Sequence, residues 1–157
     1  MKKSGLLIAA ASLIFAAPAY ALDVKKTIDI PASPDAVWKI AGDFCGIGNW
    51  HPAIEKCEIS KRNGGTYRTL SLKGGGTILE KETGWNDGAR SYSYAILESP
   101  LPVADYTASF SVNPKGNGSE IVWSSTFNAK GADDAKAASV IGGIFDAGLS
   151  AIAAKAK

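Results

Sequence analysis

The stretch Ile30–Ile59, IPASPDAVWKIAGDFCGIGNWHPAIEKCEI, predicts how the chain passes from its first strand to its second. Ser33 followed by Pro34 is typical of a helix start, because a serine hydroxyl caps free backbone amides and proline fits the first helical turn. Apolar side chains then recur at helical spacing as far as Phe44. Glycines interrupt this pattern, and residues 50–52 form a second short helical turn or corner. We therefore expect two short helices after the first strand.

The N-terminus has the pattern of a secretory signal peptide. Lys2 and Lys3 precede the apolar residues 6–18, and Ala-Tyr-Ala at residues 19–21 matches a cleavage site. The apolar run is too short to span a membrane. We expect cleavage after Ala21, which leaves residues 22–157 as a single domain, periplasmic or secreted, with no stable membrane insertion.

Charge gives no support to a nucleic-acid partner. Removing Lys2 and Lys3 from the 17 basic residues leaves 15, which equals the 15 acidic residues. A neutral chain lacks the basic surface that binds phosphate backbones or anionic membranes.

Both cysteines of the chain, Cys45 and Cys57, and its single histidine, His51, lie in the stretch quoted above. Zinc normally takes four ligands with short spacings, whereas eleven residues separate these cysteines, so the pattern disfavours a metal site. A catalytic Cys/His pair would need a free thiolate and a third, orienting group. In an oxidising compartment we instead expect a disulfide between Cys45 and Cys57.

The rest of the sequence predicts a meander of strands followed by one long helix. Short runs with alternating polarity are separated by turns rich in Gly, Asn and Pro. After a first strand at residues 24–30, we expect strands at residues 54–61, 66–73, 77–85, 89–98, 105–113 and 120–128, with residues 114–119 (PKGNGS) as the last turn. Residues 133–157 instead carry apolar side chains every three or four residues, which indicates an amphipathic helix.

Alternation predicts which strand residues face the interior, because neighbouring side chains point to opposite faces. The expected inward sets are Tyr92, Tyr94 and Ile96; Tyr106, Ala108, Phe110 and Val112; and Ile121, Trp123, Ser125 and Phe127.

This order of elements resembles the helix-grip fold of the SRPBCC superfamily, which includes START and birch-pollen-allergen proteins, and within it the polyketide cyclase/dehydrase and lipid-transport group. The resemblance covers residues 22–157 and is carried by the segments IPASPDAVWKIAGDF, NWHPAIEKCEI, RTLSL, GGGTILE, SYSYAILESPLPVADYTASFSV and IVWSSTF. It implies an α+β fold: a seven-stranded curved antiparallel sheet wrapped on a long C-terminal helix, with two short helices after the first strand. It also implies a cavity between sheet and helix.

The resemblance also implies candidate ligand-binding residues. Similarity to the plant abscisic-acid receptors, distant relatives with this fold, puts Arg68 on the inner face and pocket-lining positions at Glu80, Tyr94, Tyr106 and Trp123. Phe110 joins this set through strand alternation, and Ile144 through its position on the long helix. Residues 73–76 and 100–102 correspond to the receptors' gate and latch loops but lack their sequences, so hormone sensing does not carry over.

Arg68 and Glu80 stand six residues on either side of Gly74, so a hairpin centred there pairs them. Because burying an unpartnered charge is costly, the two either neutralise each other or offer a polar group to a ligand.

Three functions remain open. The first is a periplasmic or secreted carrier for a small hydrophobic molecule, because this fold supplies an apolar cavity. The second is a cyclase or dehydratase that uses Glu80 or His51 as an acid or base. The third is an accessory protein that binds a periplasmic dehydrogenase, because exported members of the family resemble a methanol-oxidation accessory protein. The sequence implies no metal and no cofactor.

Overall fold

The computed structural model describes residues 21–157. The predicted signal peptide lies outside these residues, apart from Ala21, and it stays a prediction. The described elements are β1 (Leu22–Ile30), α1 (Pro34–Ala41), α2 (Ile47–Trp50), β2 (Ile54–Arg62), β3 (Gly65–Leu72), β4 (Thr77–Asn86), β5 (Ser91–Glu98), β6 (Val103–Lys115), β7 (Gly118–Ala129) and α3 (Asp134–Lys155).

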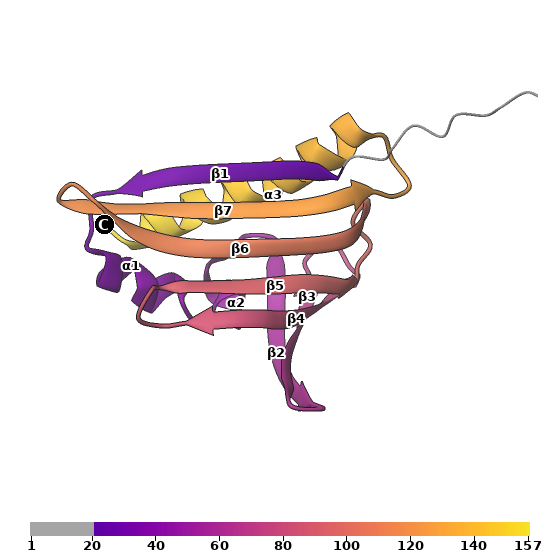
Figure 1. The fold of residues 1–157 in the computed structure, drawn as a ribbon, viewed down its shortest axis with the longest axis horizontal. Helices are drawn as coiled ribbons and strands as arrows, with labels where there is room; N and C mark the ends of the chain where they lie inside the picture. Colours follow the sequence, from indigo (N-terminus) through magenta and orange to yellow (C-terminus); the bar gives the residue numbers. More distant parts are fainter. Residues whose placement is uncertain (1–20) are drawn as a thin grey trace, which may run out of the picture.

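The strands form one antiparallel seven-stranded sheet in the order β1-β7-β6-β5-β4-β3-β2. The sheet curves around α3, which lies behind it in the view of Figure 1, and α1 and α2 close one end. The hairpin of β2 and β3 projects from the body of the molecule (Figure 1). The predicted helix-grip α+β fold is therefore confirmed, with a helical layer packed on one face of a sheet.

Several predicted boundaries differ from the structure. The first helix ends at Ala41 rather than Phe44, because the Asp43 carboxylate accepts the amide hydrogens of Cys45 and Gly46, at 2.7 and 2.8 Å, in place of helical backbone carbonyls. The second short helix comes earlier than predicted, at Ile47–Trp50. The predicted turn at residues 114–119 is wrong in length: β6 and β7 pair as far as Lys115 and Gly118, because glycine at residue 116 adopts a φ of +56° that allows a tight turn.

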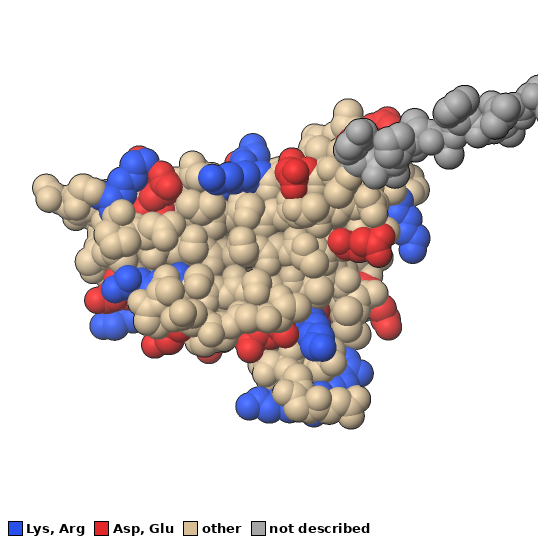
Figure 2. Space-filling view, viewed as in Figure 1, with Lys and Arg blue, Asp and Glu red and all other residues tan. Residues whose placement is uncertain are grey.

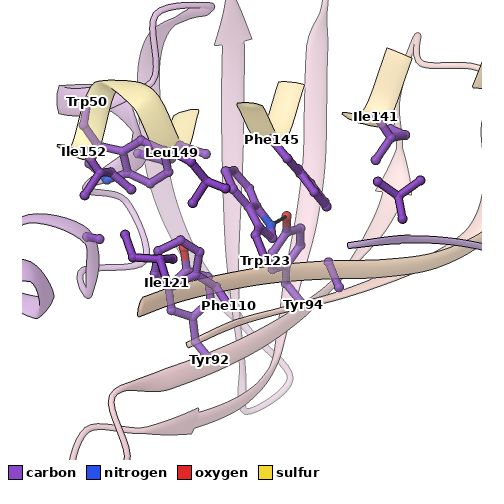
Figure 3. Packing of buried hydrophobic residues seen from close by; sticks show 14 of the residues in the cluster. Trp50, Tyr92, Tyr94, Phe110, Ile121, Trp123, Ile141, Phe145, Leu149 and Ile152 are labelled. Carbon is purple, nitrogen blue, oxygen red and sulfur yellow. Dashed lines mark hydrogen bonds between the residues drawn. The ribbon is translucent and has the colours of Figure 1, made fainter. Parts of the chain in front are cut away.

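The core lies between α3 and the concave face of the sheet. Phe145, Leu149 and Ile152 of α3 point toward the side chains of the strands (Figure 3), and Ile141 is buried on the same helix. The ring of Phe145 stacks on that of Trp123, with centroids 4.4 Å apart. Each fully buried large apolar side chain stabilises the fold by about 1.5–3 kcal/mol. By length and composition α3 could span a membrane; in the structure it packs buried side chains such as Phe145 and Leu149 against the sheet.

The convex face of the sheet is polar but carries few charges. Charged side chains lie mainly at its margins and on the β2–β3 hairpin (Figure 2). Hydroxyl groups bond to one another across this face, as between Ser109 and Ser124 at 2.9 Å and between Thr83 and Ser93 at 3.0 Å. The alternation predicted from the sequence is thus confirmed: Phe110 and Trp123, on the same strands as Ser109 and Ser124, are buried on the opposite face.

The close approach of α3 to the sheet depends on Gly148. A Cβ at this position would lie 2.8 Å from atoms of His51 and Trp123 and 3.0 Å from Trp50. A side chain larger than hydrogen would force α3 away from the sheet.

We expect Gly148→Ala to lower the free energy of unfolding by about 1–3 kcal/mol, the usual cost of overpacking a core. Gly143, on the same helix, has open space where a Cβ would lie, so Gly143→Ala should stabilise the protein by about 0.5–1 kcal/mol. Urea unfolding of the two variants measures both effects. Equal effects of the two substitutions would contradict the close approach at Gly148.

Cys45 and Cys57 form a disulfide, with their Cα atoms 5.6 Å apart. Cys45 lies in the turn between α1 and α2, and Cys57 lies on β2. The bond therefore ties the helical end of the molecule to the base of the projecting hairpin, as the sequence predicted.

Thiol titration of the folded protein should find no free thiol before reduction, because both cysteines are paired. Reduction should then cost about 3 kcal/mol of stability, since the crosslink restricts the unfolded chain, and it should lower the melting temperature without unfolding the protein. A Cys45→Ser/Cys57→Ser variant serves as the control, and its melting temperature should not respond to reductant. Two titratable thiols in the unreduced protein would refute the disulfide.

Candidate ligand pocket

A pocket of about 420 Å³ lies between α3 and the concave face of the sheet. Its volume falls within the range of about 300–1,000 Å³ that is typical of small-molecule sites. Side chains from α2, the corner after it, the six strands β2 to β7 and α3 line the pocket, together with the loop between β3 and β4 and the loop between β5 and β6. The lining residues are Ile47, His51, Ala53, Ile54, Leu70, Leu72, Lys73, Gly74, Gly75, Ile78, Glu80, Tyr94, Ile96, Leu101, Tyr106, Trp123, Val140, Ile141, Ile144 and Phe145.

The pocket exists because large side chains fill only part of the concave face. Phe110 stacks on Tyr92 with centroids 5.2 Å apart, and Trp123 meets Phe110 edge-on at 5.6 Å. These rings pack the region beneath the C-terminal part of α3, where Leu149 and Ile152 lie (Figure 3). Elsewhere many inward positions hold aliphatic side chains, which leave space under α3. These are Leu70, Leu72, Ile78, Ile96 and Leu101 from the sheet side and Val140 and Ile144 from α3.

Arg68 and Glu80 face each other across β3 and β4, as the spacing about Gly74 predicted. Arg68 Nε donates a hydrogen bond to Glu80 Oε2, and Arg68 Nη1 donates to the carbonyl of Phe44. Both residues are buried, with exposed fractions of 0% for Arg68 and 4% for Glu80. Glu80 lines the pocket, whereas Arg68 lies behind it.

Aromatic rings surround the guanidinium of Arg68. Its Cζ lies 4.1 Å from the ring centroid of Phe44 and 4.9 Å from that of Tyr94, which are favourable cation–π distances. Burial alone lowers the pKa of Arg68, but the charge of Glu80 and the nearby Tyr92 and Tyr94 outweigh it and raise that pKa, so the guanidinium stays charged. Burial also raises the pKa of the Glu80 carboxyl, against the lowering effect of Arg68.

Two tyrosine hydroxyls add polar groups to the pocket wall. Trp123 Nε1 donates a hydrogen bond to the Tyr94 hydroxyl at 3.0 Å (Figure 3). Burial raises the pKa of Tyr94 and of Tyr106 well above their ordinary value, so both phenols stay protonated. A protonated phenol can both donate and accept a hydrogen bond, which suits recognition of a ligand oxygen.

His51 lines the pocket, but both of its ring nitrogens bond to the backbone. Nδ1 accepts from the amide of Ala53 at 3.2 Å, and Nε2 lies 3.0 Å from the carbonyl of Ile144. Because an amide donates and a carbonyl accepts, the proton must be on Nε2. Burial lowers the pKa of His51 below 6.5, which favours this neutral form. His51 thus ties the corner after α2 to α3, and neither nitrogen is free to act as a base.

The structure brings five of the seven predicted ligand-binding residues into the pocket wall: Glu80, Tyr94, Tyr106, Trp123 and Ile144. Arg68 and Phe110 are fully buried but do not line it, so they could act on a ligand only through their neighbours. The role of all seven in binding stays a prediction. Sequence reasoning did not select Leu101 or Ile78, although Leu101 sits in the predicted latch-like loop, which would have been the signal.

The buried Arg68–Glu80 pair predicts that losing one partner destabilises the protein more than losing both. We expect Glu80→Ala to cost about 3–5 kcal/mol, because it leaves the Arg68 charge buried without its partner. Arg68→Ala/Glu80→Ala should be more stable than Glu80→Ala alone, since no uncompensated charge remains. Urea unfolding of the single and double variants tests this.

The exposed pair Lys56–Glu58, with a 2.9 Å contact, is the matched control. Glu58→Ala should have only the small effect of an exposed ion pair. If Glu80→Ala were no more damaging than Glu58→Ala, neutralisation of Arg68 by Glu80 would not contribute to the stability of the fold.

Similar structures agree with this architecture. XoxI from Bacillus cereus is 30% identical, with a TM-score of 0.79, and the match covers 85% of this chain and 94% of that one. An uncharacterized protein from Bacillus thuringiensis is also 30% identical, with a TM-score of 0.79, and the match covers 85% and 98% of the two chains. An aromatase/cyclase from a Streptomyces species is 20% identical, with a TM-score of 0.70 and coverages of 87% and 94%, which shows a shared fold alone.

A comparison with curated proteins found no match. The family model described as "Polyketide cyclase / dehydrase and lipid transport" matches residues 21–157, which is all of the chain that the structure describes. This chain therefore belongs to the polyketide cyclase/dehydrase and lipid-transport family, within the SRPBCC superfamily.

Proposed function

We propose that this protein is a periplasmic or secreted carrier that binds a small, largely apolar molecule. The observation that carries the proposal is the pocket under α3, which is large enough for such a molecule and is lined mainly by aliphatic and aromatic side chains. Among its polar groups, Glu80, Tyr94 and Tyr106 lie on the sheet side and would orient a ligand hydroxyl or carbonyl. Binding would bury the apolar part of the ligand against Leu70, Ile144 and their neighbours.

Two observations support export. The N-terminal sequence has the pattern of a signal peptide, and the disulfide between Cys45 and Cys57 is of a kind that persists in oxidising compartments. A periplasmic or extracellular location fits both.

Catalysis is less well supported by the same geometry. Glu80 is bound to Arg68, and both nitrogens of His51 bond to the backbone. A cyclase or dehydratase needs an acid or base that can reach its substrate, and these two candidates already have structural partners.

A role as an accessory protein is the second candidate function, and the projecting β2–β3 hairpin favours it. Ile59, on the hairpin, is an exposed large hydrophobic residue with 46% of its surface accessible, and the disulfide at Cys57 fixes the base of the hairpin. Such a protrusion suits contact with a protein partner. The carrier function remains the better supported proposal because the pocket needs no partner to be complete.

Binding of Nile red, an apolar dye whose emission rises in apolar surroundings, tests the carrier function. We expect the dye to bind the folded protein and to quench tryptophan emission, because Trp123 lies in the pocket wall. Ile144→Trp should weaken binding about tenfold or more, equivalent to about 1.4 kcal/mol, because the larger ring occupies pocket space.

Ile59→Trp is the matched control, since it makes the same change at an exposed site on the hairpin. It should leave dye binding unchanged. A folded Ile144→Trp variant that binds Nile red as well as the original protein would refute the pocket as the binding site and would favour the accessory role.

A further inference from the structure

The sheet opens between β5 and β6 near one end. Pairing between these strands stops at Ala95 and Thr107. Beyond that point β5 continues to Glu98, paired with β4, and β6 begins at Val103, paired with β7. No strand pairing therefore joins residues 96–98 of β5 to residues 103–106 of β6. The opening lies where the β5–β6 connection turns, at the right-hand end of the sheet in Figure 1.

A bulge in β6 shapes this opening. The register of β6 against β7 shifts between Ala104 and Thr107, and Asp105 has a φ of +51°. This left-handed conformation is uncommon for residues other than glycine, although aspartate adopts it more readily than most, and it persists where the surroundings hold it. Here Asn128 Nδ2 donates a hydrogen bond to Asp105 Oδ2 at 3.0 Å. Bulges re-aim side chains, and this one exposes Asp105 while it buries Tyr106.

A second pocket, of about 470 Å³, occupies the opening. Its lining residues are Ile96, Leu97, Glu98, Ser99, Val103, Ala104, Asp105, Tyr106 and Lys130. The charged groups among them carry both signs. Ile96 and Tyr106 line this pocket and also the apolar pocket, so the two spaces adjoin at these residues.

We propose that the two pockets form one bipartite site for a single-chain zwitterionic amphiphile. Its alkyl chain lies in the apolar pocket, passes between Ile96 and Tyr106, and places its head group in the opening between β5 and β6. This inference rests on the carrier function proposed above and names its ligand class.

The charges of the second pocket select the head group. Lys130 attracts the anionic part of a zwitterion, and Glu98 and Asp105 attract the cationic part. A purely anionic head would meet two carboxylates, and a purely cationic head would meet the ammonium of Lys130, so each incurs the cost of a like-charge contact. A zwitterion can place each of its charges beside the opposite one.

Calorimetric titration with three decyl surfactants, each below its micelle concentration, tests the proposal. The probes are decylphosphocholine, decyl sulfate and decyltrimethylammonium, which share a chain and differ in the charge of the head. We expect decylphosphocholine to bind about tenfold more tightly than either of the others, a difference of about 1.4 kcal/mol.

Two substitutions in the head-group pocket should change this order in opposite directions. Lys130→Gln leaves only carboxylates and should favour decyltrimethylammonium, whereas Glu98→Gln should improve decyl sulfate. Ile96→Trp should abolish the preference by closing the passage, and Ile59→Trp, at an exposed site on the hairpin, should keep it.

The outcomes separate this inference from the carrier function. If Nile red binds but the three surfactants bind equally, or if Lys130→Gln and Glu98→Gln leave their order unchanged, the bipartite site is refuted and the carrier function stands. If neither Nile red nor any surfactant binds the folded protein, both proposals are wrong.

Discussion

The packing of α3 against the concave face of the sheet is the constraint on which the rest of the molecule depends. At Gly148 the helix backbone comes so close to Trp123 and Trp50 that no side chain fits between them. Near the same place His51 bonds to the carbonyl of Ile144 and holds the corner after α2 to the helix. The C-terminal part of α3 thus packs directly on closely packed aromatic side chains, including Trp50 and Trp123. Toward its N-terminal part, aliphatic side chains leave the space that forms the pocket. The close contact at Gly148 therefore lies in the part of the core that side chains fill, and the pocket lies in the part that they leave open.

The buried pair of Arg68 and Glu80 lies at the border between the packed core and the pocket. Replacing such a pair by apolar residues is often neutral or stabilising, so stability alone is a weak reason for its presence. In this protein Glu80 faces the pocket while Arg68 stays behind it, held by the carbonyl of Phe44 and by aromatic rings. The arrangement supplies a carboxylate inside an apolar space, neutralised from behind, which is a way to offer one polar contact to an otherwise apolar ligand.

The opening between β5 and β6 gives the proposed carrier function a more specific form. If β5 and β6 paired along their whole length, a ligand could reach the apolar pocket only past the loops at its mouth. In this protein the pairing ends beside Ile96 and Tyr106. A polar pocket then adjoins an apolar one at these two residues. That pairing of environments matches an amphiphile better than a wholly apolar molecule, because each part of such a ligand finds surroundings like its own.

The sequence by itself determined the elements and the local pairings. Alternating polarity placed Phe110 and Trp123 on the inner face, spacing about Gly74 paired Arg68 with Glu80, and the only two cysteines could pair only with each other. These features depend on short-range periodicity or on a small number of choices. Tertiary structure alone decided that Arg68 and Phe110 lie outside the pocket wall and that both nitrogens of His51 are engaged. It also decided that the sheet opens beside Tyr106. Those outcomes depend on how closely α3 approaches the sheet and on a register shift between strands, and the order of residues along one strand encodes neither of these.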